Sequence, residues 1–457
     1  MYDGVVIDYF VARFGAGHPA THMADRAHIQ PIEGVASPTL HRFILFTDRL
    51  SRLTRPGQVA VIAIYTAVVA GIWGLALDSF LAGFTISLMS LFFTLVDWIA
   101  LAQLPKQKRS FGPVASGLIF FGGLRCAITV MMALLAGNPI LASTLLLVGH
   151  LALTGYALDS LWGEPFRIGV TRLAYRSPRL DHAPPLRLVH LSDFHVERLT
   201  RREHKVLALL DELRPDVILY TGDLLSFSYI DDPTAQAECR TLMSQLHAPL
   251  GVFAVTGTPV VDTDSAVENV LGGLDNIHLL NDSIVSVPGY PALKLIGLSC
   301  THNPSIDGPR LERLMDGLSD DGYKILLHHA PDVMPVAARC GIDLVLCGHT
   351  HGGQVRLPGV GALITGSVYG KRYEMGEYHE GDTTLYISRG IGMEGKGMPR
   401  MRFLCEPEIE LIELRGAHDG DGLLRERVVA RGRSKVRLPN FKGLTTRRPF
   451  DHPEARR

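Results

Sequence analysis

Five short polar motifs in this sequence each come directly after a run that predicts a buried β-strand. The strand-like runs are Leu186–Leu191, Val217–Tyr220, Val252–Val255, Lys324–Leu327 and Leu344–Cys347. The motifs, in the same order, are Ser192-Asp193-Phe194-His195, Thr221-Gly222-Asp223, Gly257-Thr258-Pro259, His328-His329-Ala330-Pro331-Asp332 and Gly348-His349-Thr350-His351-Gly352. Ligands bind outside the carboxyl ends of strands in open α/β sheets, so we expect these motifs to meet at one edge.

Four of these motifs carry Asp or His, the residue types that bind divalent cations. Asp193 and His195 bracket one strand end and can reach the same ion, whereas Asp223 follows a glycine that allows close approach to two ions. His349 and His351 offer one imidazole to each ion. Carboxylate and imidazole ligands suit Mn, Fe or Zn, and phosphoesterases often hold two ions about 3.5–4 Å apart. The motifs therefore predict a site for two divalent metal ions.

The region around these motifs has the pattern of an α/β domain. Between residues 184 and 414, short β-rich runs alternate with helical stretches at 203–213, 234–247, 264–274, 309–318 and 332–339. Charge is balanced over the whole chain, with 45 Lys and Arg against 46 Asp and Glu. We expect no nucleic-acid partner, and the sequence does not indicate an oligomeric state.

Two long blocks before this domain are almost free of charge. Residues 57–104 contain only Asp78 and Asp97 as charged residues, and residues 110–158 contain only Arg125. A membrane-crossing helix needs roughly 20 apolar residues, so each block is long enough for two crossings. We expect four helices, at 57–77, 80–103, 112–136 and 139–159. Buried hairpins in a soluble domain are the alternative, although soluble helices rarely go so long without a polar face.

Basic residues flank these blocks unevenly. They are Arg42, Arg49, Arg52 and Arg55 before the first helix, Lys106, Lys108 and Arg109 after the second, and Arg167, Arg172, Arg176 and Arg179 after the fourth. The other two loops hold no Lys or Arg, so the positive-inside bias predicts that both termini face the cytoplasm. We expect no cleaved signal peptide and no disulfide framework. Asp97 and Arg125 could mark a polar pathway, but the favoured alternative is an interhelical pair or side chains that reach the membrane interface near a helix end.

These observations divide the chain into five parts. They are a cytoplasmic N-terminal segment (1–56), a four-helix transmembrane domain (57–160), a linker (161–183), the α/β domain (184–414) and a basic tail (415–457). The tail contains twelve Lys and Arg against five Asp and Glu, which predicts disorder. It could lie on anionic lipid headgroups or simply be solvated.

Residues 184–414 resemble the calcineurin-like metallophosphoesterases, especially their bacterial membrane-associated branch. The resemblance rests on the LSDFH, TGD, HAPD and GHTHGGQ motifs and on Ser388-Arg389-Gly390-Ile391-Gly392. It implies a sandwich of two mixed β-sheets flanked by helices. It also implies that Asp193, His195 and His351 hold the first ion, that Asp223 bridges, and that His329 and His349 hold the second. Some members of this branch cleave the pyrophosphate of UDP-2,3-diacylglucosamine.

One motif departs from the family pattern. The family has Gly-Asn-His-Asp where this chain has Gly257-Thr258-Pro259-Val260. The Asn is a second-ion ligand in the family and the His is an acid or transition-state donor; Thr258 is a weaker ligand and Pro259 can fill neither role. Downstream of Gly222-Asp223, the chain has Leu224-Leu225-Ser226 where the family often has a further Asp. Nearby residues that could fill the gap are Asp262, Asp264, His302 and His328.

Three functional interpretations remain open. The favoured one is a phosphoesterase in the bacterial inner membrane, with its catalytic domain in the cytoplasm, that uses metal-activated water to cleave a phosphodiester or pyrophosphate, with a lipid-linked substrate as one option. Its catalytic residues would be Asp223, His349 and Arg389, although Arg389 is equally compatible with a structural role at the end of a strand. The second is a pseudoenzyme that binds metal or phospholipid. The third is a transporter or scaffold that the domain regulates.

Overall fold

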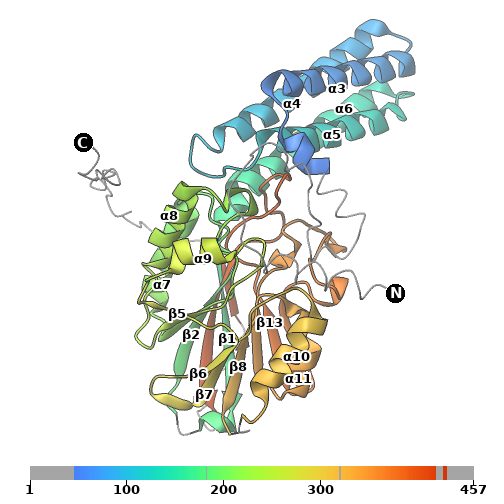
Figure 1. Ribbon diagram of the computed structural model, residues 1–457. Coiled ribbons are helices and arrows are strands. Elements are labelled where there is room, and N and C mark those ends of the chain that lie inside the picture. Colours follow the sequence, from blue (N-terminus) through green and yellow to red (C-terminus); the bar gives the residue numbers. More distant parts are fainter. Residues whose placement is uncertain (1–45, 182, 319–320, 418–425, 430–457) are drawn as a thin grey trace, which may run out of the picture. The chain divides into compact units, whose positions relative to one another are not determined.

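The computed structural model describes residues 46–181, 183–318, 321–417 and 426–429. Along the chain, four long helices come first and an α/β domain with two large sheets follows (Figure 1). The segment 1–45 and most of the basic tail lie outside the described residues, so the expectations for them are not tested.

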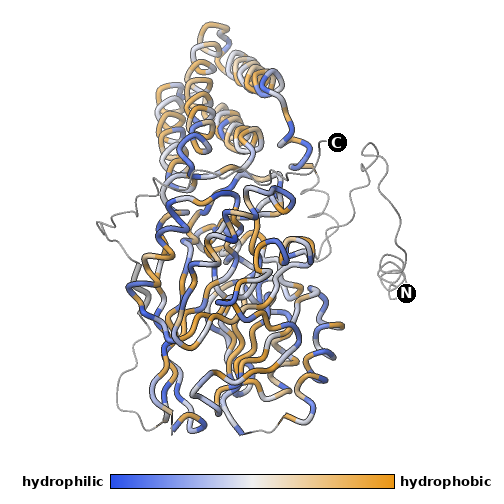
Figure 2. Tube along the Cα trace, turned by 60° about the vertical axis from the view of Figure 1, so that its left-hand side comes forward, coloured by the Kyte–Doolittle hydropathy of each residue, from blue (hydrophilic) through white to orange (hydrophobic). Residues whose placement is uncertain are grey.

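The four long helices occur where the sequence predicts them. They are α3 (Arg55–Ala76), α4 (Phe80–Gln103), α5 (Val114–Ala133) and α6 (Pro139–Leu158). Each is long and apolar enough to cross a membrane by length and composition, and Figure 2 shows their predominantly hydrophobic colouring. Side-chain caps define two of the starts: Ser79 accepts a hydrogen bond from Ala82 N, and Asn138 accepts one from Leu141 N.

The charged residues inside these helices form the expected interhelical pair. Arg125 of α5 donates to both carboxylate oxygens of Asp97 in α4, at 2.6 and 2.8 Å. Its remaining donors reach the Thr154 hydroxyl and the His150 carbonyl of α6. Both members of the pair are buried, and partners from α4 and α6 together satisfy the guanidinium carried by α5.

The α/β domain contains two large mixed sheets. The seven-stranded sheet has the order β15 (Glu426–Val429), β1 (Gly169–Ser177), β14 (Glu408–Gly416), β2 (Leu186–Leu191), β3 (Val217–Tyr220), β4 (Val252–Ala254) and β5 (Ile277–Leu279). The six-stranded sheet has the order β12 (Gly376–Glu380), β13 (Thr383–Ile387), β9 (Leu344–Cys347), β8 (Tyr323–Leu327), β7 (Tyr290–Gly297) and β6 (Ser283–Val287). A small hairpin pairs β10 (Arg356–Leu357) with β11 (Gly361–Ala362).

Five helices cover the outer faces of these sheets. They are α7 (Arg201–Leu213), α8 (Pro233–Met243), α9 (Asp264–Leu271), α10 (Pro304–Met315) and α11 (Met334–Arg339). Helix α7 begins with a capping box in which Glu203 accepts a hydrogen bond from Thr200 N. At the start of α8, Asp232 accepts from two backbone N–H groups, and Pro233 occupies the first turn.

Successive side chains of a strand point to opposite faces of the sheet, so each central strand contributes to two hydrophobic cores. In β3, Val217 and Leu219 join a core between the two sheets, whereas Ile218 and Tyr220 join a second core beneath α7, α8 and α9. In β8, Leu326 packs instead in a third core with α10 and α11. Both faces of these strands are therefore buried, which explains their continuous apolar runs (Figure 1). The expected sandwich of two mixed sheets flanked by helices is confirmed.

Two of the expected boundaries need correction. The linker expected at 161–183 contains strand β1, which pairs in parallel with β14 over nine residues. The tail expected from residue 415 also contributes, because β14 runs to Gly416 and β15 pairs antiparallel with β1. Both segments were misassigned because their pairing partners lie more than 200 residues away in the sequence.

Candidate metal centre

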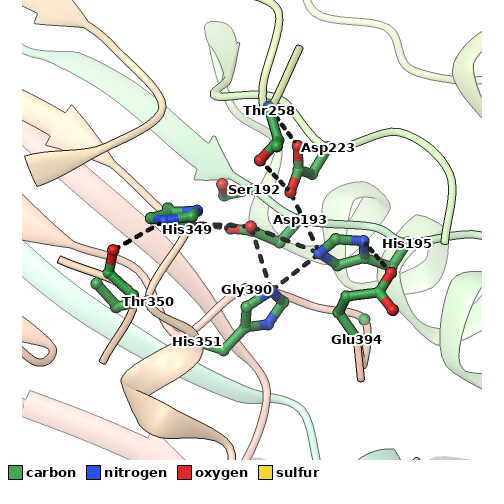
Figure 3. A network of polar contacts seen from close by, with 12 residues as sticks. Ser192, Asp193, His195, Asp223, Thr258, His349, Thr350, His351, Gly390 and Glu394 are labelled. Atoms are coloured by element: carbon green, nitrogen blue, oxygen red, sulfur yellow. Dashed lines mark hydrogen bonds and ion pairs between the residues drawn. The ribbon is translucent and has the colours of Figure 1, made fainter. Parts of the chain in front are cut away.

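The candidate centre lies where four strand ends converge. The motifs after β2 and β3 follow neighbouring parallel strands in one sheet, and those after β8 and β9 follow neighbouring parallel strands in the other. Figure 3 shows Asp193, His195, Asp223, His349 and His351 pointing toward one another from these loops. The convergence expected from the sequence is thus present in the fold.

Asp193, His195 and His351 form a first cluster that could hold an ion. The Nε2 atoms of His195 and His351 lie 3.8 and 3.4 Å from Asp193 Oδ1 and 2.9 Å from each other. All three side chains are buried. These are the three residues that the family resemblance implies as ligands of the first ion.

A second carboxylate fixes the orientation of His195. Nδ1 of His195 lies 3.3 Å from Glu394 Oε2 and 3.3 Å from the Leu225 carbonyl oxygen. Both are acceptors, so Nδ1 carries the proton and Nε2 faces the cluster. Glu394 was not among the residues selected from the sequence. It lies in a loop after Gly392 rather than at a strand end, so the strand-end pattern could not have found it.

Asp223 stands between two groups of ligand atoms. Its Oδ2 atom lies 3.5 Å from His195 Nε2 and 3.3 Å from His329 Nε2. The same carboxylate accepts hydrogen bonds from the backbone N–H and the hydroxyl of Thr258, at 2.6 and 3.2 Å. One oxygen therefore reaches both sides of the centre, as a bridging ligand must.

His302, His329 and His349 form a second cluster, with one ring nitrogen from each lying within 4.8 Å of the others. Nδ1 of His329 lies 2.7 Å from the Thr221 carbonyl oxygen, so this nitrogen donates and Nε2 faces Asp223. Nε2 of His349 lies 3.3 Å from the Gly366 carbonyl oxygen, which leaves Nδ1 free of a proton. Backbone carbonyls thus fix the tautomers that metal binding requires.

Arg389 and Asp262, which the sequence also proposes for the site, lie outside the two clusters. Arg389 is buried and forms a paired contact with Glu408 of β14, at 2.5 Å, which corresponds to the structural alternative. Asp262 accepts from the backbone N–H groups of Asp223, Leu224 and Gly257, so it ties two loops together.

Two other candidates for the gap at Thr258 also lie outside the centre. Asp264 is exposed in the first turn of α9. His328 belongs to a separate buried group with Cys300 and Asp307. Among the four residues proposed from the sequence, His302 is the one that joins the second cluster.

Backbone strain is concentrated at this centre. The φ angles of Asp193, His195, Asp223, His349 and His351 are all positive, between 42° and 65°. Non-glycine residues seldom adopt this left-handed conformation, and it persists where surrounding structure enforces it at functional sites. His302 has the same feature, with a φ of 57°.

Glycines let the loops approach closely enough to form the centre. A Cβ atom on Gly257 would collide with the Asp223 carboxylate, and one on Gly348 would collide with Asp193 and Ser192. These two positions require glycine because the carboxylates occupy the space that any side chain would need.

The electrostatics of the centre reflect this crowding. Burial opposes the charged form of Asp193 and Asp223, yet the neighbouring imidazoles lower the pKa of both carboxyls below their ordinary values. Burial also opposes protonation of His329, but Asp223 raises the pKa of this residue to about 9. Burial lowers the pKa of His351 to about 3, and burial together with His349 lowers that of His302. Imidazolium protons thus balance the carboxylates, and a divalent cation would replace them.

The donor set and its spacing fit two divalent cations. Ligand distances of about 2.0–2.2 Å in a tetrahedral site separate neighbouring ligand atoms by about 3.3–3.6 Å. The contacts of His351 with Asp193 (3.4 Å), and of Asp223 with His195 (3.5 Å) and His329 (3.3 Å), match this spacing. His195 lies closer to His351 (2.9 Å) and farther from Asp193 (3.8 Å). Asp and His ligands suit Mn, Fe or Zn.

Comparison with known proteins identifies the family. The model of the calcineurin-like phosphoesterase family matches residues 186–353. The metallophosphoesterase YkuE of Bacillus subtilis (strain 168) is 32% identical over 267 residues, which cover 56% of this chain and 88% of that protein. This chain belongs to the calcineurin-like phosphoesterase family. It is therefore a hydrolase of phosphoester bonds, as the motifs predicted.

Two further calcineurin-like relatives have more specific names. Phosphodiesterase YaeI of Escherichia coli (strain K12) is 28% identical over 243 residues, covering 51% of this chain and 84% of its own length. UDP-2,3-diacylglucosamine pyrophosphatase LpxG of Chlamydia trachomatis (serovar D) is 26% identical over 303 residues, covering 54% of this chain and 90% of its own length. The names of these relatives include both a phosphodiesterase and a pyrophosphatase.

Proposed function

We propose that this calcineurin-like protein is a membrane-anchored, two-metal phosphoesterase that cleaves a phosphodiester or pyrophosphate bond in a lipid-linked substrate. The observation that carries the proposal is the position of Asp223 between the two histidine clusters, with Oδ2 at 3.5 Å from His195 and 3.3 Å from His329. A carboxylate in this position can neutralise and space two cations at once.

The geometry of the clusters supports a ligand assignment. Asp193, His195 and His351 would hold the first ion, Asp223 would serve both, and His329 and His349 would hold the second. Two divalent cations in such a site polarise a phosphoryl group and lower the pKa of water. The chain itself supplies the orientation, because Glu394 and backbone carbonyls keep the free ring nitrogens facing inward.

The missing acid at position 259 bears on the kind of bond that is cleaved. Pro259 stands where the family motif has a His, and it carries no proton to give to a departing oxygen. A leaving group of low pKa, such as the phosphate released from a pyrophosphate, does not need protonation. We therefore favour a pyrophosphate over an alkyl phosphodiester as the natural substrate.

The four long helices support a membrane anchor. Large apolar side chains stand on their outer surface, with Leu75 of α3 exposed by 87% and Phe80 of α4 by 84%. Soluble monomeric proteins rarely expose so much contiguous apolar surface. The basic residues before α3, between α4 and α5, and after α6 favour a cytoplasmic position for the catalytic domain.

A second apolar surface supports a lipid-linked substrate. Residues 355–369, here called the apolar hairpin, expose Leu357, Val360, Leu363, Ile364, Val368 and Tyr369. The same hairpin borders the metal centre, because the Gly366 carbonyl accepts from His349 and Ser367 donates to Asp332. An acyl chain on this surface would leave the attached phosphate close to His349.

The lipid assignment can be tested apart from catalysis. In the Leu363→Asp variant, activity on a diacylated sugar-nucleotide pyrophosphate in vesicles should fall at least about tenfold, because a buried acyl contact of 1.4 kcal/mol or more is lost. Activity on water-soluble bis-p-nitrophenyl phosphate should stay unchanged. Ile306→Asp, a similarly exposed residue on α10, is the matched control. Equal activity of Leu363→Asp and Ile306→Asp on the lipid substrate would refute the assignment.

A binding protein without turnover is the second candidate, and the departure at Thr258 and Pro259 is what favours it. Such a protein would bind metal and a phosphorylated lipid but release no product. Purified full-length chain that binds two ions and fails to hydrolyse bis-p-nitrophenyl phosphate would support this alternative over the enzyme.

A further inference from the structure

One of the four residues that the sequence offers for the gap in the second metal site, His302, lies in the second cluster. His302 lies in the loop between β7 and α10, and its ring centroid is 4.3 Å from that of His349 and 5.8 Å from that of His329. Building on the two-metal function proposed above, we propose that His302 is a ligand of the second ion. It would take the role of the Asn ligand in the family motif, whose position Thr258 occupies in this chain.

The spacing of atoms around Thr258 supports this assignment. The Thr258 hydroxyl lies 3.1 Å from His302 Nε2, 3.2 Å from His329 Nε2 and 3.2 Å from Asp223 Oδ2. The hydroxyl can donate to Asp223 and accept from both imidazoles, so these contacts bring the two ring nitrogens and the carboxylate oxygen to one point. Ligand atoms around a single tetrahedral ion are separated by about the same distances.

The loop that carries His302 is held in place. Asp307 is buried and accepts from both the backbone N–H and the hydroxyl of Thr301, at 3.0 and 2.7 Å. Cys300 Sγ lies 3.7 Å from His302 Nδ1, so the other ring nitrogen, Nε2, faces Thr258. A mobile surface histidine would have none of these restraints.

The backbone of His302 also matches that of five of the six other assigned ligands, with His329 as the exception. Its φ of 57° lies within the range of these five Asp and His residues, which would hold the two ions. This strain is consistent with a ligand role, although loop residues outside the centre, such as Arg214 and Asp282, also have positive φ angles. Orientation, spacing and backbone thus agree on a ligand role.

Metal binding tests the assignment without relying on activity. The full-length protein in detergent would be stripped with a chelator and titrated with Mn²⁺ by calorimetry, with ion content checked by elemental analysis. The wild type should bind two ions per chain. His302→Ala should keep the first ion and bind the second at least roughly tenfold more weakly, the scale seen when a metal site loses one supporting group. His379→Ala, an exposed imidazole outside the clusters, should bind both ions normally.

A second variant guards against simple misfolding of the loop. Thr258→Asn in the His302→Ala background supplies an amide oxygen beside Asp223 and should restore the second ion. In the electron paramagnetic resonance spectrum, the signal of two coupled Mn²⁺ ions should disappear in His302→Ala and return in the double variant.

The outcomes separate this inference from the proposed function. Two ions bound with unchanged affinity by His302→Ala would overturn the role of His302 and leave the two-metal enzyme intact. Fewer than two ions bound by the wild type would overturn both. Loss of the second ion in His302→Ala that Thr258→Asn fails to restore would also count against a ligand role.

Discussion

Replacing Glu394 with Gln tests how the chain orients the first metal site. The carboxylate accepts N–H groups from Phe227 and Gly395 at 2.6 Å and from Lys396 at 2.9 Å, and Oε2 lies 3.3 Å from His195 Nδ1. In either orientation of a Gln amide, its NH₂ group would face backbone N–H donors. Loss of such a supporting carboxylate typically weakens metal binding roughly 10–100-fold, which corresponds to about 1.4–2.8 kcal/mol.

Calorimetric titration of chelator-stripped protein with Mn²⁺ would measure this loss. The first ion should bind roughly 10–100-fold more weakly in Glu394→Gln, because His195 loses its anionic partner, and the second ion should be affected less. Glu377→Gln is the matched control, since Glu377 also faces an imidazole, that of His379, at 2.9 Å outside the centre. Unchanged affinity for both ions in Glu394→Gln, or an equal loss in the control, would refute the reasoning.

Three further predictions address the bridge, the acid and the topology. Asp223→Ala should lose both ions and all turnover, and full occupancy by elemental analysis would contradict the bridging role. Pro259→His should raise turnover of alkyl phosphodiesters by roughly 10²-fold, the scale of a positioned acid, while p-nitrophenyl esters change little; equal effects on both would argue against a missing acid. A green fluorescent protein fused after Arg457 should fluoresce, and alkaline phosphatase at the same point should be inactive. Activity of that phosphatase would place the catalytic domain outside the cytoplasm.

Much of the sheet could be predicted because its central strands are buried on both faces. The runs before the motifs match β2, β3, β8 and β9 to within a residue, and β4 is one residue shorter than expected. Strand β1 could not be predicted, because Arg172 and Arg176 interrupt its apolar residues and its pairing partners, β14 and β15, come from the end of the chain. Pairing over such a separation leaves no local pattern.

The centre was predicted less completely than the sheet. His302 could be named as a candidate but not chosen, since its distance from Asp223 depends on β7 lying beside β8. An available signal was the strand-like run Leu293–Leu298, apolar apart from Lys294 and Gly297, which places His302 after a strand end like the other motifs. Arg389 could not be assigned because its partner, Glu408, lies on the separate strand β14.

Turnover measured against metal content is the most direct test of the central claim. Full-length protein stripped of metal would be loaded with Mn²⁺ from zero to two equivalents, and hydrolysis of bis-p-nitrophenyl phosphate would be followed at each step. A two-metal enzyme should be inactive without metal and should reach its maximum rate only at two ions per chain. Full activity in the stripped protein, or none with two ions bound, would contradict the account.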